Sequence, residues 1–318
     1  MLKNKKDKVV IVGAGAVGST IAFALSIQGL CDEIALIDIN HDKAFTEALD
    51  MQHGVAYLDR NVRISAGSYE ECRDADIVII TAAVPYIEGQ RRLDMMDSAA
   101  KIIKSIIPPI MDSGFNGIFL VVTNPVDVMA YLVYQISKLP RSQVIGTGTA
   151  LDSARLKGML AEYLQVDPKS VQAYTIGEHG DSQYIPWSNV YIGSKLFTDI
   201  LADNKARFGE LDLQQLLEDV KEAAFKAGRL KKTTNFAIAM TVAEIVKIIF
   251  ADGNTIIPVS TLLEGEYGEH EVFAGVPAVL NRQGVREIVE LRLNQDELEG
   301  FKKSVSILKE YNKKLNLV

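Results

Sequence analysis

One histidine stands in a setting suited to proton exchange. His179 lies between Gly177 and Gly180 in a polar turn, with a strand-like run on either side. The glycines leave the ring accessible, as a side chain that gives and takes a proton near neutral pH requires. The remaining histidines fit solvated helix or loop surfaces: His41, His53 and His270. His179 is therefore the candidate acid/base group.

A second candidate is a pair of opposite charges on one predicted helix. Asp152 and Arg155 are three positions apart and would share a helix face. An intrahelical ion pair worth only tenths of a kcal/mol explains this spacing as well as a functional pair does. The nearby histidine turn shifts the balance toward function.

These residues need a scaffold, and the first half of the chain predicts one. Short β-branched runs alternate with helical stretches, and continuous apolar runs suit parallel strands that are covered on both faces. We expect an α/β protein with a doubly wound, parallel Rossmann sheet. The predicted strands are Lys8–Val12, Glu33–Ile37, Val62–Ser65, Asp76–Ile80, Gly117–Val122 and Gln143–Ile145.

The turn after the first run is rich in glycine. Gly13, Gly15 and Gly18 follow a predicted strand and open a predicted helix, and Asp38 ends the next strand. Such glycines let the backbone approach a pyrophosphate, and the acidic residue can accept hydrogen bonds from ribose hydroxyls. The alternative is a tight turn with close packing. Because the carboxylate would repel a 2′-phosphate, the pattern favours NAD over NADP.

Polar segments follow three other predicted strands, where ligands bind in open α/β sheets. Segment 81–94 contains a proline and a glycine, which interrupt regular structure, and it could move as a lid. Segment 123–127 contains Asn124-Pro125, a rigid turn for which a cis peptide bond is one option. Segment 146–155 leads into the helix that carries the charged pair.

We divide the chain into a NAD-binding Rossmann domain, residues 1–148, and an α+β substrate domain, residues 149–318. The apolar helix 237–250 could be core or subunit interface, and the sequence favours core. The second half has predicted strands at Val171–Thr175, Thr255–Leu262 and Val272–Leu280, and predicted helices at Leu211–Ala227, Thr234–Ala251 and Asp296–Lys314.

The composition excludes several other classes of protein. A net charge of −7 offers no overall attraction to nucleic acid or to anionic membranes. The lysines near the start resemble an export signal, but three glycines interrupt the apolar run that follows them. No apolar stretch is long enough to span a membrane. Cys31 and Cys72 lack disulfide-framework or metal-ligand spacing, so we expect a cytoplasmic protein without a metal.

Together these segments resemble the L-lactate and malate dehydrogenase family over essentially the whole chain. The glycine turn is the least specific of the shared motifs, and the last two are the most specific. The motifs are Gly13-Ala-Gly15-Ala-Val-Gly18, Asn124-Pro125-Val-Asp127, Gly148-Thr-Ala-Leu-Asp152-Ser-Ala-Arg155 and Gly177-Glu-His179-Gly-Asp-Ser182.

The resemblance implies a NAD-dependent dehydrogenase acting on a small L-2-hydroxy acid. It implies that His179 exchanges the proton of the substrate oxygen while Asp152 holds the ring and stabilises imidazolium. Arg155 would bind the substrate carboxylate, and Arg92 on the lid would polarise the reacting carbonyl. Asn124 would position substrate and nicotinamide. The resemblance also places Thr149 at the nicotinamide and Val17 in the cofactor cleft.

Substrate choice in this family depends on the lid position six before the catalytic arginine, here Tyr86. Malate dehydrogenases typically have arginine there and lactate dehydrogenases glutamine. Tyr86 has no fixed charge and Glu88 would repel a dicarboxylate, which disfavours malate, although Arg91 tempers this. Thr234 matches the position at which lactate dehydrogenases have threonine. Pyruvate and L-lactate are therefore the leading substrates.

Other interpretations stay open. The chain also resembles hydroxyisocaproate-type enzymes around Asn124-Pro125 and Trp187, which would mean a broader L-2-hydroxy acid dehydrogenase. A non-catalytic NAD-binding protein is the rival from another class. Lys157 and Gln172 occupy the positions at which some relatives bind fructose 1,6-bisphosphate, and the glutamine weakens that site. The resemblance further suggests a homotetramer.

Overall fold

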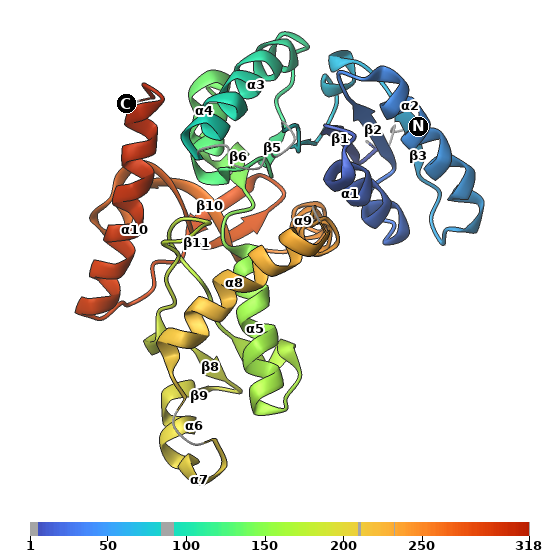
Figure 1. The fold of residues 1–318 in the computed structure, drawn as a ribbon. Coiled ribbons are helices and arrows are strands. Elements are labelled where there is room, and N and C mark those ends of the chain that lie inside the picture. The colour runs from blue at the N-terminus through green and yellow to red at the C-terminus, as the bar shows by residue number, and fades with distance from the viewer. Residues whose placement is uncertain (1–5, 84–91, 209–210, 232, 318) are drawn as a thin grey trace.

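The computed structural model describes residues 6–83, 92–208, 211–231 and 233–317 of the 318-residue chain. Its upper part is a sheet layered between helices, and a smaller helical part projects below it (Figure 1). Among the described residues, no helix combines the length and apolar character needed to cross a membrane.

Parallel strands from the first half form one side of the large sheet, out to its edge at β3, in the order β3-β2-β1-β4-β5-β6. This is the strand order of a doubly wound Rossmann sheet, and it confirms the predicted fold class. The strands are β1 (Lys8–Val12), β2 (Glu33–Ile37), β3 (Arg63–Ala66), β4 (Ile77–Ile80), β5 (Ile118–Val121) and β6 (Val144–Gly146).

Strand side chains alternate between two hydrophobic cores, one on each face of the sheet. In β1, Val10 and Val12 enter one core, whereas Val9 and Ile11 enter the other. Successive strand side chains point to opposite faces, so a strand without polar alternation must be covered twice. The helices between these strands are α1 (Ala16–Ile27), α2 (His41–Gly54), α3 (Arg92–Asp112) and α4 (Val126–Ser137), and α5 (Ala150–Leu164) follows β6.

The second half of the chain extends the same sheet. The antiparallel strand β10 (Thr255–Glu264) pairs with β6 through Ser260 and Gly146, and β11 (His270–Asn281) and β12 (Gly284–Ile288) follow it outward. The sequence had predicted strands over parts of β10 and β11 but not β12. Helices α9 (Phe236–Phe250) and α10 (Gln295–Lys314) cover opposite faces.

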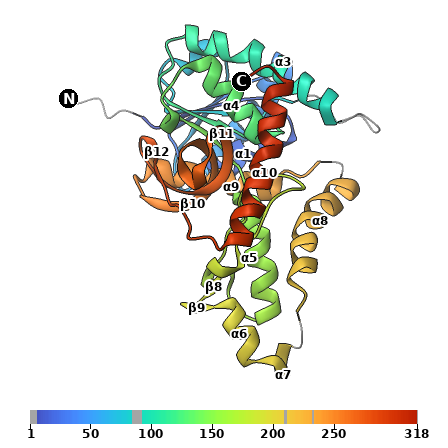
Figure 2. The ribbon, with the colours of Figure 1, turned by 90° about the vertical axis from the view of Figure 1, so that its left-hand side faces the viewer.

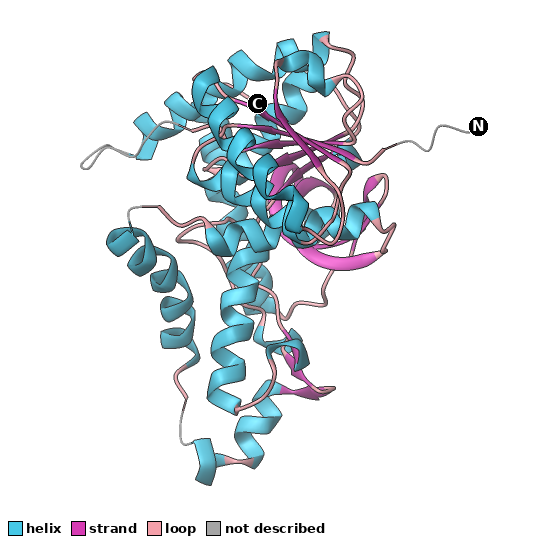
Figure 3. Ribbon diagram, turned by 90° about the vertical axis from the view of Figure 1, so that its right-hand side faces the viewer, coloured by secondary structure: helices cyan, strands magenta, loops and turns pink. Residues whose placement is uncertain are grey.

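The lower part has its own apolar cluster, in which Leu156 and Leu160 of α5 pack near Val220 of α8 (Leu213–Lys231). Figure 3 shows α5 and α8 descending from the sheet. Helix α10 instead packs against β11 and α4, as Figure 2 shows. The predicted strand 171–175 is limited to its first two residues. The remaining elements here are β7 (Val171–Gln172), β8 (Tyr191–Ile192), β9 (Lys195–Leu196), α6 (Phe197–Asp203), α7 (Lys205–Phe208) and α8 (Leu213–Lys231).

Candidate active site

The glycine turn joins β1 to α1 at the carboxyl edge of the sheet. Gly13 has a φ of +109°, and a Cβ there would lie 2.7 Å from Thr81 Oγ1. A Cβ on Gly18 would lie only 1.8 Å from the carbonyl oxygen of Gly13. Any side chain would therefore push the turn away from its neighbours. Gly15 is the N-cap of α1 and has no side chain to occupy the helix N-terminus.

Asp38 connects the end of β2 to this turn. Its Oδ2 accepts the backbone N–H of Ala14 at 2.8 Å, and its Oδ1 accepts that of Asn40 at 2.9 Å. Each carboxylate oxygen can accept two hydrogen bonds, so Asp38 retains capacity for ribose hydroxyls. The turn and the acidic residue thus form one unit.

A cavity of about 690 Å³ opens beside this unit. Three predicted cofactor residues line it, namely Gly13, Gly15 and Asp38. Val17 and Gly18 lie next to it in α1, where Val17 packs on the core beneath. The volume, the close glycine turn and the carboxylate fit an adenine dinucleotide.

The cavity also has polar lining residues that the sequence analysis missed: Lys43, Ser68, Tyr69 and Ser105. The Lys43 ammonium lies 4.0 Å from where a Cβ on Gly15 would be, so its charge stands over the glycine turn. A lysine in the first turn of an amphipathic helix looks like ordinary surface. Its position in the helix that follows β2 and Asp38 is the one feature of the sequence that indicates a place in this cavity.

The predicted acid/base residue lies on a loop held by two helices and a strand. Gly177 exchanges backbone hydrogen bonds with Gly275 of β11, and the Glu178 N–H donates to Ser304 Oγ of α10 at 2.8 Å. The His179 N–H donates to Asp127 Oδ2 at 2.8 Å. The backbone that leads into His179 is therefore fixed, while a quarter of the histidine side chain stays exposed.

The structure brings the three predicted polar residues together. His179 Nδ1 lies 2.5 Å from Asp152 Oδ2, and the Arg155 guanidinium donates to Asp152 Oδ1 at 2.7 Å. Asp152 is buried, and each of its carboxylate oxygens has one of these two residues as its partner. The carboxylate fixes the ring through Nδ1 and leaves Nε2 as the nitrogen able to exchange a proton with a ligand.

Electrostatics adapt this histidine to hold a proton. Burial by itself lowers the pKa of His179, but the charge of Asp152 and its hydrogen bond outweigh burial and raise the pKa above its ordinary value of 6.5. Burial would raise the pKa of Asp152, yet His179 and Arg155 hold it below its ordinary value. The Asp152 carboxylate is therefore ionised at neutral pH, and its charge favours the imidazolium form of the ring over the neutral form.

The remaining predicted residues lie at different depths. Asn124 is exposed at a cis Asn124–Pro125 bond, just before α4. Thr149 is fully buried and donates its hydroxyl to the Thr175 carbonyl at 2.6 Å. Thr234 is half-buried in the connection between α8 and α9. Its neighbour Asn235 donates to Thr20 of α1 at 2.7 Å, which places that connection over the helix that follows the glycine turn.

Two predicted residues cannot be placed fully. Tyr86 lies outside the described residues. Arg92 is the first residue of α3, and its side chain is outside the described part of the chain. At the weakened phosphate position, Lys157 lies over the ring of Tyr174, and burial lowers its pKa, while Gln172 is exposed on β7.

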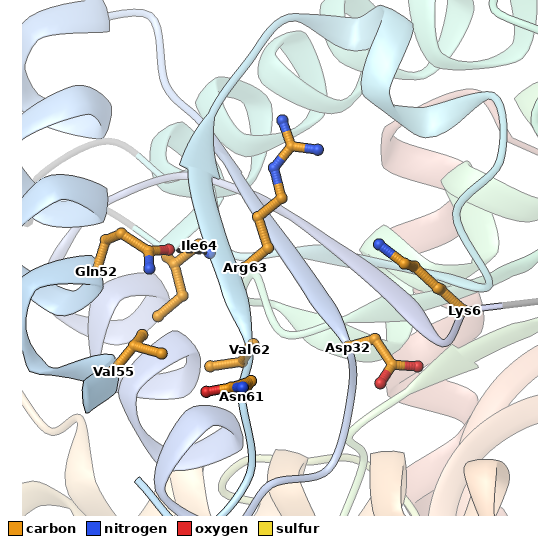
Figure 4. A pocket seen from close by; sticks show the side chains of 8 residues that line it. All are labelled: Lys6, Asp32, Gln52, Val55, Asn61, Val62, Arg63 and Ile64. Carbon is orange, nitrogen blue, oxygen red and sulfur yellow. Dashed lines mark hydrogen bonds between the residues drawn. The ribbon is translucent and has the colours of Figure 1, made fainter. Parts of the chain in front are cut away.

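A second cavity, of about 620 Å³, lies at the other edge of the sheet. Most of its residues precede or begin strands, as Asp32 does before β2 and Arg63 in β3, while Gln52 and Val55 come from the end of α2 and the turn after it. Figure 4 shows these side chains around the strand starts. Ligands of doubly wound sheets bind at the carboxyl ends of strands. This cavity is therefore separate from the candidate active site.

Comparison with known proteins agrees with this arrangement. The family model for the lactate/malate dehydrogenase NAD-binding domain matches residues 7–146, and that for the alpha/beta C-terminal domain matches residues 149–316. L-lactate dehydrogenase 3 of Bacillus anthracis is 47% identical over 312 residues, which are 98% of this chain and 99% of that protein.

Solved structures show the same likeness. The ligand-bound minor L-lactate dehydrogenase of Enterococcus mundtii has a TM-score of 0.94 and 45% identity, covering 97% of this chain and 98% of that one. A lactate dehydrogenase from a Medee basin deep-sea metagenome has a TM-score of 0.95 and 42% identity, covering 98% and 99%.

Fold and site together define a NAD-dependent L-2-hydroxy acid dehydrogenase. The chain belongs to the lactate/malate dehydrogenase family.

Proposed function

We propose that this chain catalyses the reversible NADH-dependent reduction of pyruvate to L-lactate. The observation that carries the proposal is the buried Asp152 carboxylate, which joins an acid/base imidazole to a guanidinium within one cluster. A 2-keto acid offers a carbonyl oxygen that needs a proton and an adjacent carboxylate that needs a cation. The relatives named L-lactate dehydrogenase support the same reaction.

In this mechanism each residue has one task. Bound NADH supplies the hydride that reduces the carbonyl carbon. The His179 imidazolium gives its proton to the developing alkoxide, and Asp152 stabilises the charged ring before transfer. Arg155 binds the substrate carboxylate with the donors that Asp152 does not use. In the reverse reaction neutral His179 takes the proton back.

Of the remaining predicted residues, we assign Arg92 to catalysis and the others to binding. Arg92 would polarise the carbonyl, and Asn124 would orient substrate beside the nicotinamide. Tyr86 and Thr234 would surround the substituent on the keto acid. For the cofactor we propose Gly13, Gly15, Val17, Gly18, Asp38, Asn124 and Thr149.

The division of labour along the chain is also a proposal. Residues 1–148 would bind the cofactor and residues 149–318 would supply the substrate-binding and acid/base groups. The two halves share one sheet, because Ser260 of β10 pairs with Gly146 of β6.

A panel of keto acids tests the substrate. We expect pyruvate to have the highest kcat/KM among pyruvate, 2-ketobutyrate, 2-ketoisocaproate, phenylpyruvate and oxaloacetate. Oxaloacetate should be at least about tenfold poorer, because its second carboxylate would meet tyrosine instead of a cation. The measurement is loss of NADH absorbance at 340 nm.

The same panel contains the contradicting outcomes. A preference for 2-ketoisocaproate or phenylpyruvate would establish the broader hydroxyisocaproate-type enzyme. A preference for oxaloacetate would overturn the interpretation of Tyr86. No turnover with any keto acid, in protein that binds NADH, would leave the non-catalytic NAD-binding alternative.

We further propose a cytoplasmic homotetramer. Cys31 and Cys72 are free and buried, and burial raises the pKa of each thiol to about 12, which suits a chain that forms no disulfides. Large apolar side chains are exposed on three helices, and α1 packs against α9. They are Phe23 and Ile27 of α1, Phe45 and Leu49 of α2, and Phe236 and Met240 of α9.

Light scattering after size exclusion tests the assembly. We expect a mass four times that of one chain. Met240→Glu should give smaller species, because it puts a charge on a residue that is 63% exposed and would lie between copies. Lys247→Glu, at an already charged position of the same helix, is the control. A wild-type monomer would refute the proposal.

A further inference from the structure

A second buried carboxylate contacts His179 from an element that the mechanism above does not use. Asp127, in the first turn of α4, is only 2% exposed. Its Oδ2 accepts the His179 N–H at 2.8 Å, and its Oδ1 accepts the Ser260 hydroxyl of β10 at 2.6 Å. Asp127 therefore holds the backbone of the residue whose ring Asp152 holds.

A purely local role does not account for this carboxylate. An acidic residue in the first turn of a helix commonly caps it, but α4 has no side-chain capping hydrogen bond, and its N-cap is Pro125. Both Asp127 oxygens instead reach outside the helix, to residues 52 and 133 positions away in the sequence. The contacts connect the acid/base loop to β10.

Hydrogen-bond geometry alone does not require an acid at this position. Asparagine has nearly the same shape, and its amide could accept from the His179 N–H and donate to the Ser260 hydroxyl. A buried carboxylate is costlier than an amide, and burial raises the pKa of Asp127 to about 6 despite the Ser260 and His179 hydrogen bonds. Above that pH the Asp127 carboxylate is mostly ionised, although the hydrogen-bond geometry alone does not require a charge there.

The charged groups around His179 come from three elements. Helix α5 contributes Asp152 and Arg155, helix α4 contributes Asp127, and the loop itself contributes Glu178. Asp152 is the stronger influence on the ring, Asp127 acts in the same direction, and Arg155 opposes both. Glu178 accepts the Ser182 hydroxyl at 2.5 Å.

We propose that Asp127 is a positioning residue for the proposed reaction, which fixes the His179 backbone and supplies a second negative charge that favours imidazolium. The Ser260 hydroxyl favours the ionised form of that carboxylate by donating to it. This inference rests on the proposed function for its catalytic meaning, but the electrostatic coupling itself can be measured without turnover.

Histidine NMR of the full chain tests the coupling. The chain has four histidines, so ¹³Cε1 labelling gives few signals, and His179→Gln identifies the one from His179. We expect Asp127→Asn to lower the pKa of His179 by about 0.5 to 1 unit, because a nearby negative charge is lost while the shape is kept. The high-pH fall of kcat/KM for keto-acid reduction should move down by the same amount, with NADH affinity unchanged.

Two neighbouring variants on β10 give a matched comparison. Ser260→Ala should lower the pKa of His179 by less than Asp127→Asn does. Without the Ser260 donor the pKa of Asp127 rises, so its carboxylate is ionised over a narrower pH range. Thr261 is fully buried, and its hydroxyl has no hydrogen-bond partner among the described residues. Thr261→Val should therefore leave the pKa of His179 unchanged.

The outcomes separate the two proposals. If the pKa of His179 in both Asp127→Asn and Ser260→Ala stays within 0.2 units of wild type, Asp127 is only structural and the inference is wrong, whatever happens to the rate. Should Asp127→Asn fail to fold, the Ser260→Ala and Thr261→Val pair decides. A shifted pKa in a protein that reduces no keto acid would support the coupling and refute the proposed function.

Discussion

His179→Gln is expected to lower kcat for keto-acid reduction by about a thousandfold, within the range that a positioned acid contributes. Glutamine keeps a polar group of similar length but cannot deliver a proton to the developing alkoxide. NADH binding should be unchanged, because the cofactor cavity is lined by other residues. Absorbance at 340 nm measures turnover, and NADH fluorescence measures binding.

His270→Gln is the matched control for this variant. His270 is an exposed residue at the start of β11, where the same substitution can be made away from the site. The turnover of the His270→Gln variant should equal that of wild type. Asp152→Asn should also lower kcat strongly, because an amide no longer stabilises imidazolium and can hold the ring in the wrong tautomer. Turnover by His179→Gln within tenfold of wild type would show that another group supplies the proton.

Arg155→Gln is expected to reduce kcat/KM for pyruvate by about 30- to 4,000-fold, chiefly through a higher KM. Removing one partner of a buried charged pair costs about 2 to 5 kcal/mol, and about 1.4 kcal/mol corresponds to a factor of ten. The substrate carboxylate would enter a site that still contains the buried Asp152 charge but lacks the guanidinium.

Arg155→Lys separates charge from shape. Lysine keeps the positive charge but cannot form two parallel hydrogen bonds, so its kcat/KM should lie between wild type and Arg155→Gln. Because Arg155 also lowers the pKa of His179, Arg155→Gln should raise that pKa, the reverse of the Asp127→Asn effect. A KM for pyruvate unchanged in Arg155→Gln would place the carboxylate elsewhere.

The cofactor-binding half was the more predictable part of the fold. Strands β1 and β2 begin and end at the predicted residues, because continuous apolar runs buried on both faces have few alternative structures. Strand β12 was missed because it is an edge strand whose Arg286 and Glu287 are exposed, so its composition resembles a loop. Strand pairing between distant segments leaves no mark in local composition.

The candidate site was predictable to a similar extent. The accessible histidine, its partners on α5 and the glycine turn carry local signals. Lys43 carries none, and Asp127 stands in the Asn124-Pro125-Val-Asp127 motif without any sign of its contact with His179. Their roles in binding and catalysis stay predictions that the variants above test. The structure adds that His179 and Arg155 both lie within hydrogen-bond distance of Asp152.

The sequence by itself determined the local chemistry of this protein. It specified a turn that only glycine can form, an acidic residue at the end of β2, and an imidazole on a polar turn. Only the tertiary structure decided that Asp152 meets the ring of His179 and that Asp127 meets its backbone. These carboxylates are 27 and 52 positions from the histidine, and they reach it only when α4, α5 and the sheet pack together. Burial of apolar surface determines which helices and strands pack together. Residues far apart in the sequence can therefore lie in contact in the folded chain.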